Sequence, residues 1–547
     1  MRYKSNVLFF TLLIISVIPL FDLLKPGLPL THDGQDHVAR IANFYQNLSE
    51  GVFVPRWAGN LNWGYGHPIL EFLYPLPSYF ASLFHFLGFS LVDATKLVFG
   101  DSFVLSAPAM YIFVRELLKD EKAALLAGLL YVIAPYRLVD LYVRGAIGEH
   151  VAFIFPPLIF YFLLRLSKRY SVWYLIGGGL SFAALNLSHN AISLMFIPLF
   201  GAYAAFLFLH SKNKVKLVIA YLVTILLGFG LSAFFWIPAF MEGKYTLRDI
   251  VTGGGEYKSG FVAVKDFFFG QWNYGGTLTL SKQIGMIQWI GIFAGVVSAY
   301  FLHKNKNKLW IVSLGSLVVL GATLFLMTET SDLIWRSVSI LQKFQFPWRL
   351  LSLTVFLSAL LGAIAFHSLI NKPKRIILLI IVVGLLIANK DYWHANGFLS
   401  KPESFFTQIY NGTTDTGESA PIWSIRFMEK RPKSRIEIIE GAGEIKEKER
   451  NFTKHRYEII AFEKSRILEN TLYFPGWTVL VNGKNSDIQF QDPNYRGLIT
   501  FYLNKGKHNI EIIYAETRVR QTANMVSVIS LLIIGSLVFG SISKKIV

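Results

Sequence analysis

The sequence predicts an α-helical polytopic membrane protein with about 12–13 transmembrane helices, followed by a small C-terminal extracytoplasmic β domain. Hydrophobic residues make up 53% of the 547 residues, and charged residues only 16%. Many apolar runs approach the ~20 residues that cross a bilayer as a helix. Only helices and closed barrels satisfy their backbone in lipid, and these runs lack the alternation of strands, so we expect helices.

The first apolar run follows a basic N-terminus, in MRYKSNVLFFTLLIISVIPLF. A cleaved signal peptide has a similar pattern, but it ends in a small-residue cleavage site. Proline and aspartate interrupt the run here instead, so we predict a retained first helix. The sequence contains no cysteine, so disulfides and thiolate metal sites contribute nothing to the fold.

Short basic clusters separate the apolar runs and predict the topology. The seven clusters are Arg2/Lys4, Arg115/Lys119/Lys122, Arg165/Lys168/Arg169, Lys212/Lys214/Lys216, Lys304/Lys306/Lys308, Lys372/Lys374/Arg375 and Lys544/Lys545. The positive-inside rule places all of them in the cytoplasm, so the chain crosses an even number of times between neighbouring clusters. We expect cytoplasmic termini and crossings near 7–24, 97–117, 123–136, 150–166, 172–188, 191–210, 217–240, 284–302, 309–327, 346–370, 376–390 and 522–541.

One further apolar stretch, 69–90, would break the even count. It reads ILEFLYPLPSYFASLFHFLGF and contains Glu71, two prolines and His85. We therefore expect a juxtamembrane or re-entrant helix on the outer face. The remaining outer loops are then the segments 25–96, 137–149, 241–283 and 328–345.

The chain divides into a transmembrane domain (1–390), an extracytoplasmic β-rich domain (391–521) and a last helix (522–547). Short alternating runs such as HRYEIIAF and HNIEIIYA, separated by turn residues, predict the β domain. The net charge of +18 lies mainly in clusters between the apolar runs. We therefore expect a lipid bilayer and no nucleic acid as partner, and a multi-pass location in the plasma (cytoplasmic) membrane.

Ionisable side chains gather just after the first helix, in THDGQDHVAR, which contains His32, Asp33, Asp36, His37 and Arg40. Asp33 and His37 are one helical turn apart, as are Asp36 and Arg40. Asp33 could serve only as a helix cap. The functional alternatives are a general base, whose pKa rises on desolvation near lipid, or a site for a hard divalent cation.

A second ionisable group lies in YRLVDLYVRGAIGEH, with Arg137, Asp140, Arg144, Glu149 and His150. One interpretation is a solvated loop in which Asp140 and Arg144 form an exposed pair. The other is a phosphate site, because the forked donors of arginine suit phosphate oxygens. Glu149 would then supply a second acid, and ionisable residues at membrane depth are functional candidates.

Aromatic residues lie in two further segments. Trp57, Trp63 and Tyr65 alternate with glycines, which is typical of an interfacial belt or of a surface that stacks on a sugar or lipid headgroup. Trp348 and Arg349 begin a helix at the outer surface in FQFPWRLL, where the arginine could anchor the helix or meet a lipid phosphate.

The glycine-rich stretches do not form a nucleotide site. GGGL, at 177–180, lies inside an apolar helix and lacks the lysine and hydroxyl residue of a phosphate loop. TGGGEY, at 252–257, lies in an outer loop, away from cytosolic ATP. The sequence therefore argues against an ATP-driven pump.

The order of these segments resembles the GT-C membrane glycosyltransferases: an acidic motif after the first helix, an amphipathic helix, the YPLPSYF stretch and a second acidic outer loop. HDGQDHVAR, PRWAGNLNWGYGHPILEFLYPLP, YRLVDLYVRGAIGEH and FPWRLL resemble a bacterial branch named for a supposed relation to 6-pyruvoyl-tetrahydropterin synthase. YFPGWTVLVNGK and GKHNIEIIYAETRVR are similar to the C-terminal part of YfhO-like membrane proteins.

The resemblance implies a GT-C-like fold and a lipid-linked sugar donor, bound at the outer face. Asp33 then corresponds to the catalytic base, with Asp36 as its substitute and Glu149 as a further acid. Asp36, His37 and Glu149 are the candidate ligands of a divalent cation, magnesium or manganese, although the sequence has no D-x-D motif at this place. The residues expected to bind substrates are His32, His37, Trp57, Trp63, Tyr65, Arg137, Arg144, His150 and Arg349.

The function predicted on this basis is transfer of a sugar from a polyprenyl-phosphate donor to an extracytoplasmic glycan, lipid or protein acceptor. A polyprenyl phosphate is a suitable leaving group outside the cell, because it needs no ATP. The alternatives are a transporter or flippase for a lipid-linked glycan and a non-catalytic envelope assembly factor.

Overall fold

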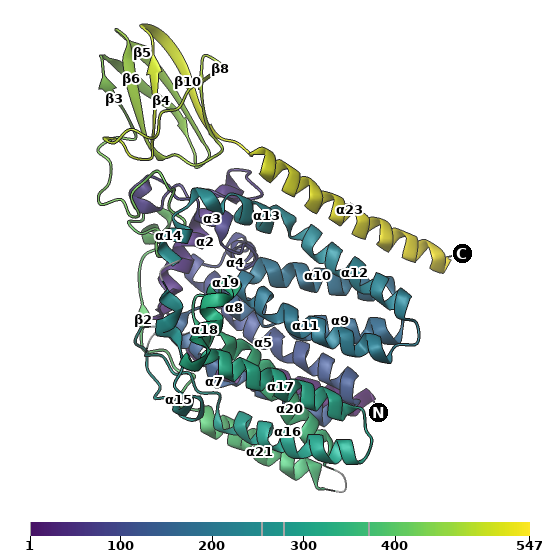
Figure 1. Cartoon of the computed structure of the whole chain (residues 1–547). Helices are drawn as coiled ribbons and strands as arrows, with labels where there is room; N and C mark the ends of the chain where they lie inside the picture. The colour runs from purple at the N-terminus through teal and green to yellow at the C-terminus, as the bar shows by residue number, and fades with distance from the viewer. Residues whose placement is uncertain (1, 253–254, 277–278, 370–371, 547) are drawn as a thin grey trace.

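The computed structural model describes residues 2–252, 255–276, 279–369 and 372–546. A layer of long helices makes up most of the molecule, and the strands of the C-terminal region stand at one end of it (Figure 1). The predicted fold class, a helical polytopic membrane protein with a C-terminal β region, is confirmed.

The elements follow the chain in the order predicted from the apolar runs. Those of the first third are α1 (Arg2–Val17), η1 (Ile18–Leu24), β1 (Leu28–Pro29), α2 (Gly34–Ser49), η2 (Asn62–Gly64), α3 (Ile69–Phe72), α4 (Leu76–Phe86), α5 (Leu91–Leu118), α6 (Glu121–Val132), α7 (Pro135–Val139), the π-turn η3 (Asp140–Arg144), α8 (Ile147–Ala152) and α9 (Phe155–Lys168). The following elements are α10 (Val172–Ser188), α11 (Asn190–His210), α12 (Lys214–Leu231), α13 (Ala233–Met241), η4 (Gly243–Tyr245), α14 (Arg248–Thr252), η5 (Glu256–Gly260), α15 (Val264–Phe268), α16 (Met286–Lys304), α17 (Leu309–Met327), η6 (Glu329–Ser331), α18 (Asp332–Ser337), α19 (Ser339–Gln342), η7 (Pro347–Leu350), α20 (Leu351–His367), α21 (Lys374–Asn389), β2 (Phe398–Leu399) and α22 (Ser404–Thr407).

Nine helices in the described part of the chain are long and apolar enough to cross a membrane, and α6 with Pro135–Arg144 makes a tenth if that bent pair is one span. Each of the twelve expected crossings coincides with a helix. The helices at two of these crossings, α10 with 17 residues and α21 with 16, are not among the helices counted as long enough. The expected number of 12–13 spans is therefore reduced to nine or ten by the criterion of length.

The stretch 69–90 forms two short helices. α3 has four residues and α4 has 11, which is too short to cross a bilayer as a helix. Pro75 stands between them, at the N-cap of α4, and the chain turns there. The prediction that this stretch does not cross is in accord with these lengths.

Two of the basic clusters, those at 115–122 and 165–169, meet at one end of the helices. Glu116 forms ion pairs with Lys119, Arg165 and Lys168 at 2.7, 3.2 and 2.9 Å. Both ends of the chain also lie at the end of the helical layer that is remote from the strands (Figure 1). The even number of crossings between neighbouring clusters agrees with this arrangement.

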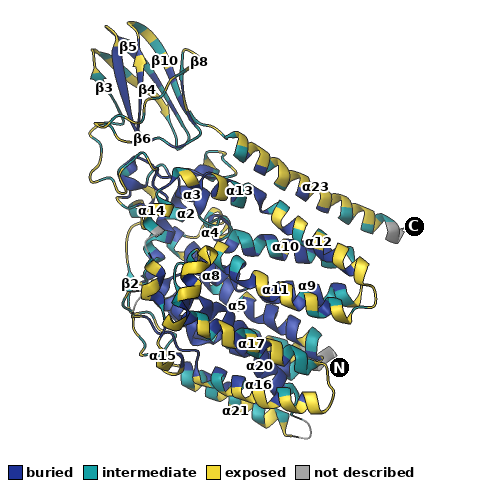
Figure 2. Ribbon diagram, in the orientation of Figure 1, coloured by how far each residue is buried: buried dark blue, intermediate teal, exposed yellow. Residues whose placement is uncertain are grey.

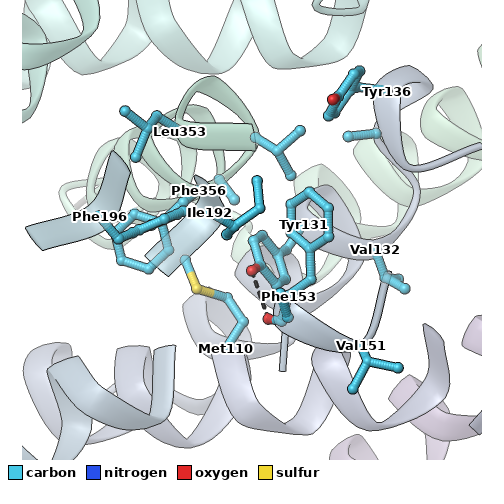
Figure 3. Packing of buried hydrophobic residues seen from close by; sticks show 14 of the residues in the cluster. Met110, Tyr131, Val132, Tyr136, Val151, Phe153, Ile192, Phe196, Leu353 and Phe356 are labelled. Carbon is cyan, nitrogen blue, oxygen red and sulfur yellow. Dashed lines mark hydrogen bonds between the residues drawn. The ribbon is translucent and has the colours of Figure 1, made fainter. Parts of the chain in front are cut away.

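The helical core centres on α20, because 94% of the most apolar part of Pro347–His367 is buried inside the protein. Figure 3 shows Phe356 of this helix in a cluster with side chains that include Met110 of α5, Tyr131 of α6 and Phe196 of α11. The Phe356 ring lies 4.7 Å from that of Phe160, and the Tyr131 hydroxyl donates to the Phe153 carbonyl at 2.7 Å. A helix that is apolar on every side is buried in the middle of a bundle.

Figure 2 shows exposed residues along the peripheral helices, and many of these are large hydrophobic residues, such as Leu222 and Leu226 of α12. In the last helix, α23 (Arg518–Ile546), only 6% of the most apolar part is buried inside the protein. Large exposed hydrophobic surfaces are normal only where lipid or a partner covers them. The outer faces of these helices therefore suit contact with the bilayer.

The C-terminal strands are β3 (Ile436–Glu440), β4 (Gly443–Arg450), β5 (Lys454–Ala461), β6 (Ser465–Leu472), β7 (Trp477–Val481), β8 (Lys484–Ser486), β9 (Leu498–Leu503) and β10 (Gly506–Tyr514). They form two antiparallel sheets, in the orders β4-β5-β10-β7-β8 and β3-β6-β9. Both sheets contribute to one apolar cluster, with Ile459 and Ile512 from the first and Ile467 and Phe501 from the second. The segment before β3 runs along the helical part, where β2 pairs with β1.

Candidate active site

The two acidic segments predicted from the sequence are joined backbone to backbone. The amide of His32 donates to the Val143 carbonyl at 3.0 Å, and the amide of Asp33 donates to the Arg144 carbonyl at 2.9 Å. The His32 ring, through Nε2, lies 2.5 Å from the Gly275 carbonyl oxygen of a third segment. Residues that are more than 100 positions apart in the sequence therefore lie at one place.

Gly145 allows this close approach. Its φ of +65° favours glycine, and a Cβ atom there would overlap the Thr31 side chain. The Thr31 hydroxyl accepts the Gly34 amide at 3.1 Å at the start of α2. Asp33 occupies the N-cap position, but its carboxylate makes no capping hydrogen bond. Its role as a simple cap is thus not supported, and the half-buried carboxylate is left available for chemistry.

The first turns of α2 place three ionisable side chains near one another. The Tyr410 hydroxyl donates to Asp36 at 3.0 Å, and burial raises the pKa of this carboxyl while Arg40 opposes the rise. Burial, with Arg40 and Arg144 nearby, holds the pKa of His37 well below its usual value, so His37 is neutral at pH 7. Arg40 donates from Nε to Thr414 at 2.9 Å.

Glu149 is the centre of a buried ionic cluster. Its Oε1 accepts from Arg144 and from Arg349, each at 2.7 Å, and its Oε2 accepts from the Tyr136 hydroxyl at 2.9 Å. The His189 ring lies 3.8 Å from Oε1. The carboxylate is almost fully buried, and burying a charge requires such pairing.

A break in the helix aims Arg144 into this cluster. The bent pair of α6 and Pro135–Arg144 turns by 43°, and the π-turn η3 ends at Arg144. Arg144 donates to Asp140 at 2.5 Å and lies over the Trp348 ring at 4.7 Å. Asp140 and Arg144 therefore form the predicted ion pair, but the pair is buried and not exposed as that interpretation expected.

A small cavity lies between α2 and the 69–90 stretch. It holds about 20 Å³ and is lined by His37, Arg40, Ile41, Phe44, Leu70, Leu73, Tyr74, Pro75, Pro77, Ser78 and Ile147. The Tyr74 ring packs on His189 with centroids 4.9 Å apart, and Gly148 leaves room for it. Burial raises the pKa of Tyr74 to about 12, and the charges of Arg40, Asp33 and Glu149 also act on this hydroxyl. Charges from both acidic segments thus surround Tyr74.

The cations at this site differ in their availability. Arg144 has two carboxylate partners, and Arg349 has one together with the Phe344 carbonyl at 2.9 Å. Arg40 forms no ion pair within the described residues, and it lines the cavity. Arg40 is therefore the cation best placed to receive an anion, with Arg349 second.

Arg137 and His150 lie in the apolar interior. Arg137 is fully buried, stacks on Phe153 at 4.1 Å and donates to the Ser106 hydroxyl at 3.1 Å. The His150 ring stacks on Phe103 at 5.6 Å. The structure does not bring these two side chains to the cavity, and they support the helix packing behind it.

The aromatic residues of the 54–68 segment face the β region. Trp57 packs against Trp477 and Tyr514 at 5.4 and 5.3 Å. The Tyr65 carbonyl accepts the Leu472 amide, and the Trp63 amide donates to the Tyr410 carbonyl, both at 2.9 Å. These three residues connect the helical part to the strands and do not line the cavity beside Tyr74.

Four residues near the acids were not among the predicted site residues: Arg40, Tyr74, His189 and Tyr410. Arg40 follows His37 by three positions, so helical spacing alone could have placed it on the same face of α2. Tyr74 and Tyr410 come from segments without helical or strand periodicity. No local pattern in the sequence predicts their position.

The proposed metal ligands do not fit a cation. Asp36 accepts from Tyr410, and Glu149 lies between Arg144 and Arg349, whose positive charges oppose a metal ion. Among the described residues, no group of three or more His, Asp or Glu side chains is placed to hold a metal. We therefore derive no chemical step through a metal at these side chains.

An uncharacterized protein of Lactococcus lactis subsp. cremoris (strain MG1363) is 24% identical over 277 residues, which cover 49% of this chain and 45% of that protein. The chain therefore matches less than half the length of this curated relative.

Similar solved structures include the arabinofuranosyltransferase AftD from Mycobacteria, with a TM-score of 0.46 and 13% identity over 74% of this chain and 28% of that chain. The Archaeoglobus fulgidus oligosaccharyltransferase gives a TM-score of 0.43 and 13% identity, over 77% and 61% of the two chains. ArnT from Cupriavidus metallidurans, solved with undecaprenyl phosphate, gives 0.31 and 11%, over 67% and 78%.

The family comparison covers the helical part. The description "6-pyruvoyl-tetrahydropterin synthase related domain; membrane protein" matches residues 70–395, which is more than half of the chain. This range contains the Glu149 cluster and the cavity-lining 70–78 segment. The predicted family is thereby confirmed, and the chain belongs to the 6-pyruvoyl-tetrahydropterin synthase related family of membrane proteins.

Proposed function

We propose that the protein is a membrane glycosyltransferase, which moves a sugar from a polyprenyl-phosphate donor to a hydroxyl group of an extracytoplasmic acceptor. The observation that carries the proposal is the backbone joint of His32 and Asp33 with Val143 and Arg144. It brings a carboxylate without a hydrogen-bond partner in the described structure beside a cluster of arginines. A general base next to a site for an anion is what such a transfer needs.

Asp33 is the proposed general base. It takes the proton of the acceptor hydroxyl, whose oxygen forms the new bond to the anomeric carbon of the donor. The bond between that carbon and the phosphate oxygen breaks, and the electron pair leaves with the lipid phosphate. Asp36 lies one turn further along α2, where its hydrogen bond with Tyr410 orients it beside the base.

Arg40 and Arg349 are proposed to hold the phosphate. The leaving phosphate gains negative charge in the transition state, and preorganised cations stabilise such charge. Glu149 holds Arg144 and Arg349 in place and keeps this cluster from being purely cationic. Glu149 is thus a positioning residue, since both of its oxygens are already occupied by protein donors.

The proposed orientation follows from the charges. The basic clusters at one end of the helices mark the cytoplasmic side, and α2, the cavity and the β region then lie outside. A polyprenyl phosphate carries its own leaving group, so the reaction is independent of cytosolic nucleotides. The orientation predicts that a membrane-impermeant reagent labels a cysteine introduced into the β region from outside intact cells.

Donor binding requires the cavity to open. Its volume of about 20 Å³ holds one water molecule and not a sugar. The 73–78 segment, which contains Tyr74 and two prolines, Pro75 and Pro77, lines one side of the cavity. We propose that this segment moves outward when the donor enters.

The test is the pair of variants Asp33→Asn and Asp36→Asn in purified protein, with Asp93→Asn as a matched control. Asp93 stands in the first turn of α5 and pairs with Lys96 at 2.9 Å, outside the cavity. We expect Asp33→Asn to lower turnover by about 10²–10⁴-fold, with unchanged binding of a polyprenyl-phosphate sugar. Normal transfer by Asp33→Asn would contradict the proposal.

The same variants separate the alternatives. A flippase for a lipid-linked glycan would tolerate at least one of the two changes, since it cleaves no bond. An assembly factor would tolerate both. Retained envelope function in cells with Asp33→Asn therefore identifies one of these alternatives instead of a transferase.

A further inference from the structure

A second, larger cavity lies between the helical part and the β region. It holds about 300 Å³, and contributions come from α2, the 57–65 segment, the 404–415 segment and strands of both sheets. Its lining is mainly polar, and its charged residues are Glu50, Arg435 and Arg450. This volume reaches the lower end of the range of small-ligand sites.

The cavity carries an arginine without an acidic partner. Arg435 donates to the Gly64 carbonyl at 3.1 Å and forms no ion pair within the described part of the chain. Burial and the neighbouring Arg450 and Arg431 lower its pKa, but a guanidinium stays charged at pH 7. An anion in the cavity would relieve this repulsion.

The interior end of the β sandwich is polar where the cavity meets it. Arg450 donates to Glu469 at 2.7 Å, and the His455 ring nitrogen Nδ1 lies 3.0 Å from the same carboxylate. Glu469 is fully buried, and its Oε2 has no hydrogen-bond partner among the described residues. A buried ion pair of this kind is often no more stable than well-packed apolar residues, and here it leaves a polar surface at the cavity.

The acid of the cavity has its own partners. Glu50 accepts from Gln46 at 2.9 Å and from the Phe452 amide at 2.9 Å. It therefore does not neutralise Arg435. Phe452 adds a partly exposed aromatic ring, which can stack on the apolar face of a sugar.

Two chain segments, α2 and the segment around Thr407, contribute both to the lining of this cavity and to the candidate active site. Thr407 lines the cavity, and Tyr410, three residues later, donates to Asp36. Gln46 lies ten residues after Asp36 on α2, which corresponds to about 15 Å along a helix. A chain of sugars could thus reach from the cavity to the acids.

We propose that this cavity binds an acidic glycan, through Arg435 and Arg450, and that the glycan is the acceptor of the transfer reaction. The second part of this statement rests on the proposed function, whereas the first does not. The shared chemistry is a carboxylate or phosphate group on a hydroxyl-rich ligand. Arginine binds both groups through paired hydrogen bonds.

The test is binding of three probes to the full-length protein in detergent, by saturation-transfer NMR: glucose 6-phosphate, glucuronate and glucose. We expect the two acids to bind at least about tenfold more tightly than glucose, a difference of about 1.4 kcal/mol. Whichever of the two acidic probes binds more tightly shows whether phosphate or carboxylate is the preferred group. Equal binding of glucose and both acids would overturn the proposal.

Variants localise the binding. Arg435→Gln should abolish the preference for acids, whereas Arg431→Gln, four residues earlier at an exposed position outside the cavity lining, should leave it unchanged. Thr407→Trp keeps all charges and fills the exposed mouth, so it should weaken the binding of every probe. Wild-type binding by a folded Arg435→Gln protein, checked by its melting temperature, would also overturn the proposal.

The Asp33→Asn variant separates this proposal from the proposed function. It should bind the acidic probes as the wild type does, even though it transfers no sugar. Loss of acid binding by Asp33→Asn would contradict a separate cavity, and binding without any transfer by the wild type would contradict only the transferase proposal.

Discussion

Two buried ionic clusters with similar side chains have different surroundings. Around Glu149, two arginines share one carboxylate, and the cavity-lining Tyr74 lies within the influence of that charge. Around Arg520, one guanidinium contacts Glu71 at 2.8 Å and Glu242 at 2.6 Å. In the first cluster two arginines meet two carboxylates, those of Glu149 and Asp140, whereas in the second one arginine meets two acids.

The positions of the clusters suggest different tasks. Arg520 stands in the first turn of α23 and joins this helix to α3, to α13 and to the Pro475 carbonyl at 2.8 Å. All of these are structural elements around the base of the β region. The Glu149 cluster adjoins the first acidic segment instead, through Arg144. A buried ion pair alone is therefore weak evidence for function, and its neighbours decide the interpretation.

The largest expected effect is a loss of stability at Arg520. Arg520→Met leaves Glu71 and Glu242 buried without a cation, and breaking a buried pair in this way costs about 3–5 kcal/mol. Thermal unfolding in detergent should show a clear decrease, while the turnover per folded molecule stays near that of the wild type. Unchanged stability with lost turnover would show that the second cluster is catalytic.

Gly145→Ala tests the joint at the first cluster. The positive φ and the contact with Thr31 disfavour a Cβ atom, so we expect a destabilisation of about 1–3 kcal/mol. Because the joint positions Asp33, turnover should fall as well. The control Gly483→Ala also has a positive φ but nothing lies near its Cβ position, so it should lower stability alone. Equal losses of turnover in both variants would contradict the idea that the backbone contact at Gly145 positions Asp33.

Arg349→Lys compares charge with geometry. Lysine keeps the positive charge but cannot reproduce the planar fork that holds Glu149 and a phosphate together. We expect the Kd for polyprenyl phosphate to rise about tenfold, which is about 1.4 kcal/mol. The matched change Arg520→Lys should leave this Kd unaltered, and a similar rise in both variants would remove the distinction between the clusters.

The smallest expected effect is a pH dependence from Glu71. Burial raises the pKa of Glu71 to about 8, against the attraction of Arg520 and with the added repulsion of Glu242. A raised folded-state pKa contributes stability that is complete below about pH 4.5 and is lost as the pH rises through about 8. Glu71→Gln should therefore reduce the loss of unfolding free energy between these pH values by on the order of 1 kcal/mol. The melting temperature should then decline less with rising pH than it does in the wild type. An unchanged slope would contradict this assignment.

The sequence predicts the fold class, the positions of the helices and the two acidic segments because each leaves a local pattern. Apolar runs and basic clusters mark the helices, and the helical spacing of Val38, Ile41 and Phe44 marks α2. The predicted crossings 172–188 and 376–390 match α10 and α21 to within two residues, and both helices are shorter than the ~20 residues that cross a bilayer. The predicted domain boundaries at 390 and 521 stay predictions.

The composition of the site is only partly predictable, because its members come from distant segments. Asp33, Glu149 and Arg349 stand in recognisable motifs, whereas Tyr74 and Tyr410 acquire their positions only through tertiary contacts. Arg137 and Glu149 have similar local surroundings in the sequence. Only the packing places Arg137 among Phe103 and Phe153 and Glu149 beside the first acidic segment.

The most direct test of the single-site interpretation is a structure of the full-length protein with bound polyprenyl phosphate. The account predicts the phosphate between Arg40 and Arg349, about 3 Å from a guanidinium nitrogen, with the Tyr74 segment displaced and Asp33 facing the same space. A phosphate held only at the end of the helices where Lys168 and Lys119 lie, with the cavity beside Tyr74 still closed, would contradict it.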